Sequence, residues 1–130
     1  MIQKDKQLLL KVLCGMLPHG VICKTKKGDG HLCSINQTIF GTEYGININP
    51  LKRDYFGDSE TEEQAIKPYL RPMSSMTEEE EKERNNIALF HSGNIASVPT
   101  YIDFLNKHHF DYRGLIEKGL ALEAPADMYK

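Results

Sequence analysis

HLCSINQTIFGTEYGININ, residues 31–49, decides the fold, because it contains two β-rich runs on either side of a short turn. Apolar residues alternate with polar ones in both runs, which is typical of an antiparallel hairpin with one buried face. A two-residue loop at 42–43 places Ile39 opposite Ile46, and a four-residue loop that includes Gly41 keeps the same facing. A three-residue loop turns the two isoleucines to opposite faces, so we expect one of the first two registers.

The two-residue register also sets Phe40 above Gly45. An aromatic ring above a strand glycine compensates for the missing side chain, which favours this register. The turn itself argues the other way, since Thr42-Glu43 is a poor pair for a tight type I′ turn.

A third strand is expected before this hairpin. VICKT, 21–25, is rich in β-formers, and KKGDG, 26–30, contains two glycines that favour a turn. A loop centred on Gly28 places Cys23 opposite Cys33. The residues expected on the buried face are Cys23, Cys33, Ile35 and Ile39.

The first segment, residues 2–17, is predicted to be an amphipathic helix that lies on the sheet. Ile2, Leu9, Leu13 and Met16 recur at three- and four-residue spacing, and two more leucines widen the stripe. The helix is expected to end before Pro18, because the residue before a proline is disfavoured in the α region.

Residues 49–64 show no sustained period and are expected to form a loop that becomes acidic, with one helical turn near 60–65. AIKPYLRPM, 65–73, is expected to be extended. Its two prolines, Pro68 and Pro72, cannot donate ladder hydrogen bonds, so this strand belongs at a sheet edge. Together these elements predict an α+β fold with an N-terminal helix on a small antiparallel sheet, and an SH3-like barrel is an alternative closure of the same strands.

KPYLRPMSSMTEEEEKERNN, 67–86, is expected to join this sheet to a helical C-terminal part. Thr77 and Glu80 form a capping box, and Ser75 with Glu78 is a second candidate. Glutamates in a first turn also complement the helix dipole. The glutamate run is therefore interpreted as a solvated helix start rather than as a ligand site.

Two further short helices are expected, one at 100–110 and one of two turns that begins at Asp111 and stops at Gly119. They resemble a helix-turn-helix only superficially, because the second is short and carries mixed charge. The whole chain, 1–130, is expected to be one domain, with the helix and sheet in 1–73 and the helical part in 74–130.

Composition places the chain among ordinary globular proteins. It has 130 residues, of which 40% are hydrophobic and 26% are charged. No apolar run approaches the roughly 20 residues that a membrane span needs, and the first residues do not resemble a signal peptide. We therefore expect a cytoplasmic protein. Its cysteines, Cys14, Cys23 and Cys33, are expected to be small buried thiols.

Charge is distributed unevenly. Residues 1–57 carry eight Lys/Arg against four Asp/Glu, a net charge of +4, whereas residues 58–130 carry eight against fourteen, a net charge of −6. The total of −2 disfavours generic nucleic-acid binding, although the basic half keeps a local version of it open. This separation of charge between the two halves also favours self-association or a partner of matching polarity.

The search for catalytic chemistry yields no motif. The adjacent His108 and His109 point roughly 100° apart on a helix and cannot share a metal as a pair four residues apart does. The chain has no His-x-x-x-His, no Cys/His cluster, no P-loop and no Gly-x-Gly-x-x-Gly. We expect no catalytic residues, no metal, no cofactor and no enzyme activity.

The candidate functional surface combines aromatic and basic residues near the expected sheet edge. Such a mixture stacks on bases or anchors a protein partner, and the alternative is that the rings close the end of a small barrel. We favour a protein partner, with nucleic acid as the second hypothesis and no membrane. The candidate partner-binding residues are Tyr44, Lys52, Arg53, Tyr55, Phe56, Tyr69 and Arg71.

Four blocks of the sequence, LPHGVICKT, YGININPLKRDYFGD, IKPYLRPMSSMTEEEEKE and FLNKHHFDYRGLIEKGLALEAP, resemble a set of small uncharacterised proteins from gut-bacterial phages and prophages. The resemblance covers nearly the whole chain. It implies an accessory protein of a mobile element, without an activity or a site that can be carried over.

Overall fold

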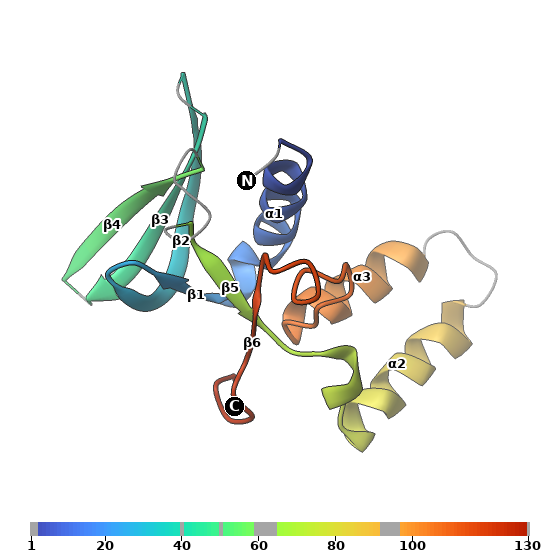
Figure 1. The fold of residues 1–130 in the computed structure, drawn as a ribbon. Coiled ribbons are helices and arrows are strands. Elements are labelled where there is room, and N and C mark those ends of the chain that lie inside the picture. Colours follow the sequence, from blue (N-terminus) through green and yellow to red (C-terminus); the bar gives the residue numbers. More distant parts are fainter. Residues whose placement is uncertain (1–2, 40, 50, 59–64, 92–96, 130) are drawn as a thin grey trace.

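The computed structural model describes residues 3–39, 41–49, 51–58, 65–91 and 97–129 (Figure 1). Within these ranges the chain forms six strands, three α-helices and two short 3₁₀ helices. The elements in chain order are α1 (Gln3–Met16), η1 (Leu17–His19), β1 (Ile22–Thr25), β2 (Gly28–Thr38), β3 (Gly41–Asn49), β4 (Lys52–Gly57), β5 (Lys67–Leu70), η2 (Met73–Ser75), α2 (Glu78–His91), α3 (Ser97–Lys107) and β6 (Leu122–Glu123). None of the described helices is both long and apolar enough to cross a membrane.

The strands form one sheet in the order β4-β3-β2-β1-β5-β6. All neighbours are antiparallel except β5 and β6, which are parallel. The α+β class predicted from the sequence is confirmed, with the helix first, a mostly antiparallel sheet next and further helices after it. The sheet order is open, with β4 and β6 at its ends, and gives no support to an SH3-like barrel.

The main core lies between α1 and one face of the sheet. The buried residues of α1 are Leu9, Val12, Leu13 and Met16, and they pack in one cluster with strand residues that include Ile46 and Leu70. Leu17 lies just beyond the last residue of α1, so the helix ends where Pro18 predicts. Figure 1 shows the sheet on the left and all three α-helices on its right.

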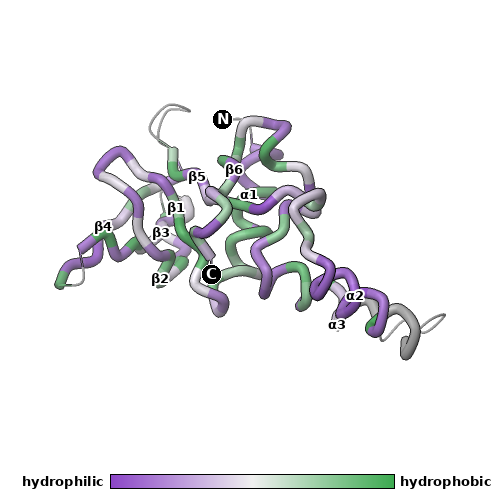
Figure 2. The backbone as a smooth tube through the Cα atoms, turned by 90° about the horizontal axis from the view of Figure 1, so that it is seen from below, coloured by the Kyte–Doolittle hydropathy of each residue, from purple (hydrophilic) through white to green (hydrophobic). Residues whose placement is uncertain are grey.

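A smaller cluster joins α2 and α3. Phe104, Leu105 and Phe110 are buried in it, and Met76 and Ile87 pack against them from the side of α2. Residues 78–86 of α2 are all polar or charged, and Figure 2 shows the described part of this helix as mostly hydrophilic. The capping box is confirmed, because the Thr77 hydroxyl accepts the backbone N–H of Glu80 at 3.2 Å.

The expected pairing of the first hairpin is wrong. Cys23 lies opposite Gly30 and Thr25 opposite Gly28, so the loop is the two residues 26–27. The Thr25 hydroxyl closes this turn by donating to the Gly28 carbonyl at 2.7 Å and accepting the N–H of Lys27 at 3.1 Å. These two hydrogen bonds stabilise a tight two-residue turn, so the loop is shorter than expected and Gly28 is already part of the second strand.

The expected pairing of Ile39 with Ile46 is also wrong. Thr38 pairs with Gly41, Ile39 is 93% exposed, and Ile46 lies opposite Leu32. A bulge between Leu32 and Ser34 reverses which residues face the core, so Leu32 is buried where Cys33 was expected. A bulge adds one residue that no alternation pattern reveals. Tyr55 lies over Gly45, and Phe40, which was expected there, falls outside the described residues.

Two further segments differ from expectation. Residues 52–57, expected to be a loop, form β4, an edge strand in which Phe56 alone is fully buried. Residues 112–119, expected to be a helix, form successive turns, because Gly114 has a left-handed φ of 74°. The chain therefore lacks the second helix of a helix-turn-helix in this segment. The helical turn expected near 60–65 falls mostly outside the described residues.

Candidate functional site

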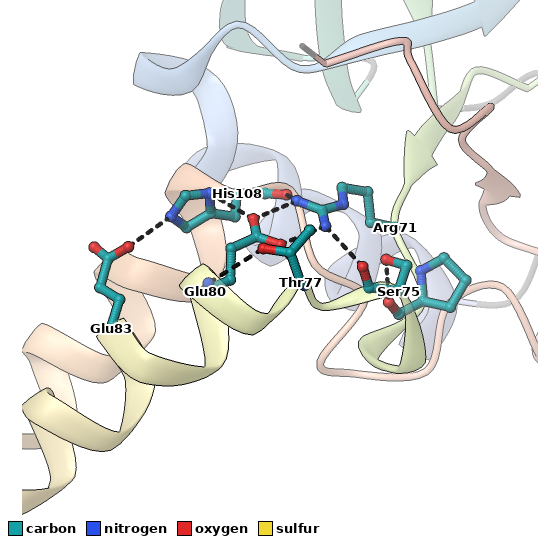
Figure 3. A network of polar contacts seen from close by, with 7 residues as sticks. Arg71, Ser75, Thr77, Glu80, Glu83 and His108 are labelled. Carbon is teal, nitrogen blue, oxygen red and sulfur yellow. Dashed lines mark hydrogen bonds and ion pairs between the residues drawn. The ribbon is translucent and has the colours of Figure 1, made fainter.

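Arg71, directly after β5, connects the sheet to the helical part (Figure 3). Its guanidinium donates one hydrogen bond to each carboxylate oxygen of Glu80, and both N–O distances are 2.7 Å. It also donates to the carbonyl of Ser75 at 3.1 Å and lies over the ring of Phe110, 4.4 Å from the ring centre. Because a two-pronged arginine–carboxylate contact combines charge with fixed geometry, Arg71 holds α2 and the turn after α3 in one arrangement.

Glu80 is saturated with donors. Besides the two bonds from Arg71, it accepts the backbone N–H of Thr77 at 2.9 Å and faces Nδ1 of His108 at 3.0 Å. The hydrogen bond from Arg71 is the main cause that lowers the pKa of Glu80 from 4.5 to about 2, while burial opposes it and the Thr77 N–H adds to it. Glu80 is therefore an anion at neutral pH and has no proton to transfer.

His108 lies between two carboxylates from one face of α2 (Figure 3). Its Nδ1 is 3.0 Å from Glu80, and its Nε2 is 3.3 Å from an oxygen of Glu83. The edge of the ring also packs on Phe104. Because each ring nitrogen faces a carboxylate on α2, His108 acts as a clamp between the end of α3 and α2.

These residues form the floor of an open groove of about 800 Å³, which we call the Arg71 groove. Its lining residues are Arg71, Pro72, Ser75, Thr77, Glu79, Glu80, Glu83, His108, Glu123, Ala124, Pro125, Ala126 and Tyr129. Four carboxylates against one guanidinium leave the groove with a charge of −3 when His108 is neutral. The C-terminal segment adds Ala124, Pro125 and Ala126, which are small and apolar, together with Tyr129.

Two hydroxyls that line the groove are engaged within the molecule. The Ser75 hydroxyl donates to the Pro72 carbonyl at 2.7 Å, and the Thr77 hydroxyl caps α2. His108 faces carboxylates instead of a hydroxyl, so the lining residues contain no nucleophile beside a base. Among the described residues, no cluster of three or more His, Cys, Asp and Glu side chains is arranged to hold a metal ion.

Of the seven candidate partner-binding residues, two are buried in the core and five are not. Tyr44 and Phe56 lie opposite each other on β3 and β4, and each is 1% exposed. They belong to the core, which corrects the expectation that they contact a partner. The reason is that β4 is a strand, so alternate residues point inward, and Phe56 fills the space beside Tyr44.

The remaining five candidates do not form one surface. Arg53 and Tyr55 project from the outward side of β4, and the exposed Lys52 lies 3.8 Å from Asp54. The Tyr69 hydroxyl donates to Asp29 at 3.1 Å. Arg71, whose guanidinium is engaged within the molecule, is the single member of the set that lines the groove.

Sequence reasoning did not select Glu80, Glu83, His108 or Glu123. One signal was available, since Glu80 and Glu83 are three residues apart and so share a helix face. Nothing in the sequence indicates that this face meets Arg71 and His108. Arg71 lies 9 residues before Glu80, and His108 lies 25 residues after Glu83, so only the tertiary fold brings them together. Comparison of the chain with models of protein families, with curated proteins and with solved structures gives no match.

Proposed function

We propose that this chain is a non-catalytic binding protein whose Arg71 groove takes a basic segment of a partner protein. The observation that carries the proposal is the charge of the groove. Arg71 donates to Glu80 and Ser75, so it does not neutralise the other carboxylates of the groove. Glu79, Glu123 and the Glu83 side chain, which stays 44% exposed although one oxygen faces His108, are the carboxylates available to a cationic ligand.

The mixed lining of the groove favours lysine or arginine over a small cation. Pro72, Pro125 and the adjacent alanines supply apolar surface beside the carboxylates. Long basic side chains place their aliphatic stems on such surface while the charged head reaches an acid. A phosphate-bearing ligand is disfavoured here, because the groove repels anions.

The floor of the groove is built in advance of binding. The two-pronged Arg71–Glu80 contact and the His108 clamp fix η2, α2 and the end of α3 relative to one another. A rigid surface loses little conformational entropy when a partner docks, which supports a binding role. The resemblance to phage and prophage proteins suggests that the partner is a host or phage protein. The unpaired cysteines, with Cys14 exposed, fit a reducing compartment such as the cytoplasm.

The test is a fluorescence-anisotropy titration with a labelled lysine- and arginine-rich peptide, at low salt and at several-fold higher salt. We expect saturable binding that salt weakens. Replacing Glu79, Glu83 and Glu123 together with glutamine should weaken it about tenfold, since each partly exposed charge pair contributes a fraction of a kcal/mol to about 1 kcal/mol.

The matched control carries Glu78→Gln, Glu81→Gln and Glu117→Gln, three exposed carboxylates that do not line the groove. It changes the net charge by the same amount and should bind the peptide nearly as tightly as the unmodified chain. Equal loss in both triple variants, or equal binding of a glutamate-rich peptide, contradicts the proposal. Cleavage or modification of the bound peptide, seen by mass spectrometry, contradicts its non-catalytic part.

A further inference from the structure

In the described part of the chain, none of the three α-helices packs on the face of the sheet opposite α1. Figure 1 places the three α-helices to the right of the sheet, and the view from below in Figure 2 again shows them on one side. The buried residues of the strands point toward α1, so their neighbours in sequence point to the open side. We call this open side the outer face.

The strand register sets four residues of the outer face in one row. Arg53 on β4 lies opposite Asn47 on β3, Asn47 opposite His31 on β2, and His31 opposite Ile22 on β1. Arg53 and His31 are exposed, and Asn47 is partly exposed. The row therefore presents a guanidinium, an amide and an imidazole side by side across neighbouring strands.

Gly45 lies under a second group of side chains on this face. A Cβ built on Gly45 would lie 2.2 Å from the Ser34 hydroxyl, 2.9 Å from Cδ of Arg53 and 3.3 Å from Cε1 of Tyr55. The three side chains thus converge above the bare backbone of β3. Covering a strand glycine is one role for Tyr55, yet the residue remains 53% exposed, so much of it stays open to solvent.

Ser34 adds an unsatisfied group to this site. Its hydroxyl oxygen is buried and, within the described part of the chain, has no hydrogen-bond partner. A buried hydroxyl without a partner is costly and calls for an explanation. A ligand that displaces the side chains of Arg53 and Tyr55 slightly would give Ser34 the partner that it lacks.

The outer face carries one more basic than acidic residue, whereas the Arg71 groove is acidic. Lys24, Arg53 and Lys67 lie on the outer face, and its acids are Asp29 and Glu43. Asp29 accepts the hydrogen bond of the Tyr69 hydroxyl. Lys27 and Lys52 do not add to the positive charge of this face, because both pair with Asp54, which lies opposite the buried Ile46 and so points to the α1 side.

We propose that the outer face binds single-stranded nucleic acid, with a base stacked on Tyr55 and the backbone phosphates held by Arg53 and Lys24. An exposed ring beside a guanidinium fits bases and phosphates, respectively. Asn47 and Ser34 offer hydrogen-bond donors and acceptors to base edges. A duplex hides its base faces within the stack, so the same ring has nothing to stack on.

The test uses labelled single-stranded oligonucleotides, one of DNA and one of RNA, with a DNA duplex of the same length. Fluorescence anisotropy at low salt should show binding of at least one single strand and clearly weaker binding of the duplex. Tyr55→Ala should weaken single-strand binding about tenfold, whereas Tyr55→Phe, which keeps the ring, should bind nearly normally. Arg53→Ala should reduce the slope of log affinity against log salt by about 0.7.

Two exposed positions away from the outer face serve as controls. Ile39→Ala removes an exposed apolar side chain at the β2–β3 turn, and Lys107→Ala removes an exposed cation at the end of α3. Both should bind single strands normally, as should the triple glutamine variant of the Arg71 groove. Absence of single-strand binding at low salt overturns the proposal, as does equal binding of duplex and single strand. Unchanged affinity in Tyr55→Ala, with circular dichroism confirming its fold, also overturns it.

Discussion

The imidazole of His109 lies parallel to the ring of Tyr129, with the ring centres 3.8 Å apart and the planes 10° apart. His109, two residues after the end of α3, has a left-handed conformation (φ 61°), and its Nε2 is 2.7 Å from the carbonyl oxygen of His19. The stack fixes the C-terminal segment against η1 and α3. Because this segment lines the Arg71 groove, the contact also positions the groove.

Acid should destabilise the fold through His109. Burial is the main cause that lowers the pKa of His109 below 6.5, so the ring is neutral in the folded chain. Below pH 6.5 the unfolded chain binds a proton that the folded chain excludes, and the free energy of unfolding falls as the pH drops. In His109→Asn, which tolerates the left-handed conformation, this fall should be smaller. Urea unfolding between neutral and mildly acidic pH measures it, and parallel pH profiles for the two proteins contradict the assignment.

Tyr129→Phe should destabilise the chain by about 1–2 kcal/mol, because it leaves buried backbone groups without partners. The Tyr129 hydroxyl accepts the N–H of Ile22 at 2.9 Å and donates to the carbonyl of Tyr69 at 2.6 Å, which joins β1 to β5. The stack on His109 is kept in this variant. Urea unfolding and faster hydrogen exchange of the Ile22 amide measure the effect. Tyr101→Phe is the control, and an equal change in both variants is inconsistent with a role for the Tyr129 hydroxyl.

Glu80→Gln should lower the free energy of unfolding by about 2 kcal/mol, since it removes charge-assisted bonds to Arg71 and leaves a guanidinium partly buried. Thermal or urea unfolding at neutral pH measures the loss. Glu81→Gln, at the exposed next position, should change stability by less than about 0.5 kcal/mol. Similar stabilities for the two variants would show that the Arg71 contact does not hold the helices.

Strong acid should remove the contribution of Glu80. Its pKa is lowered in the fold to about 2, so the contribution is complete above about pH 4.5 and is lost as the pH falls toward 2. The difference in unfolding free energy between the unmodified chain and Glu80→Gln should therefore shrink across that window. A difference that stays constant down to the lowest pH argues against the ionised pair.

The α1 stripe, the capping box at Thr77 and the α+β class followed from periodicity and cap chemistry, which are local properties. Register did not, because the bulge at Cys33 and the side-chain-closed turn at Thr25 each depend on a single residue that alternation does not reveal. Strand β4 was missed since Phe56 is its one fully buried residue, so its inward side lacks an apolar pattern.

The candidate site is harder to predict from the sequence than the fold. The sequence identifies candidate aromatic and basic residues by type, but it does not show which side of the sheet each one points to. Tyr44 points inward and is buried, whereas Tyr55 points outward and is exposed. The glutamate run was correctly assigned to a capped helix start. Its function in the Arg71 groove depends on His108 and on the C-terminal segment, which approach it only through tertiary packing.

A two-dimensional NMR titration of the isotope-labelled chain with the lysine- and arginine-rich peptide tests the central claim most directly. The account predicts saturable shifts of backbone amides from Ser75 to Glu83 and from Glu123 to Tyr129, with β4 unaffected. Shifts confined to the sheet, or none at low salt, would contradict it.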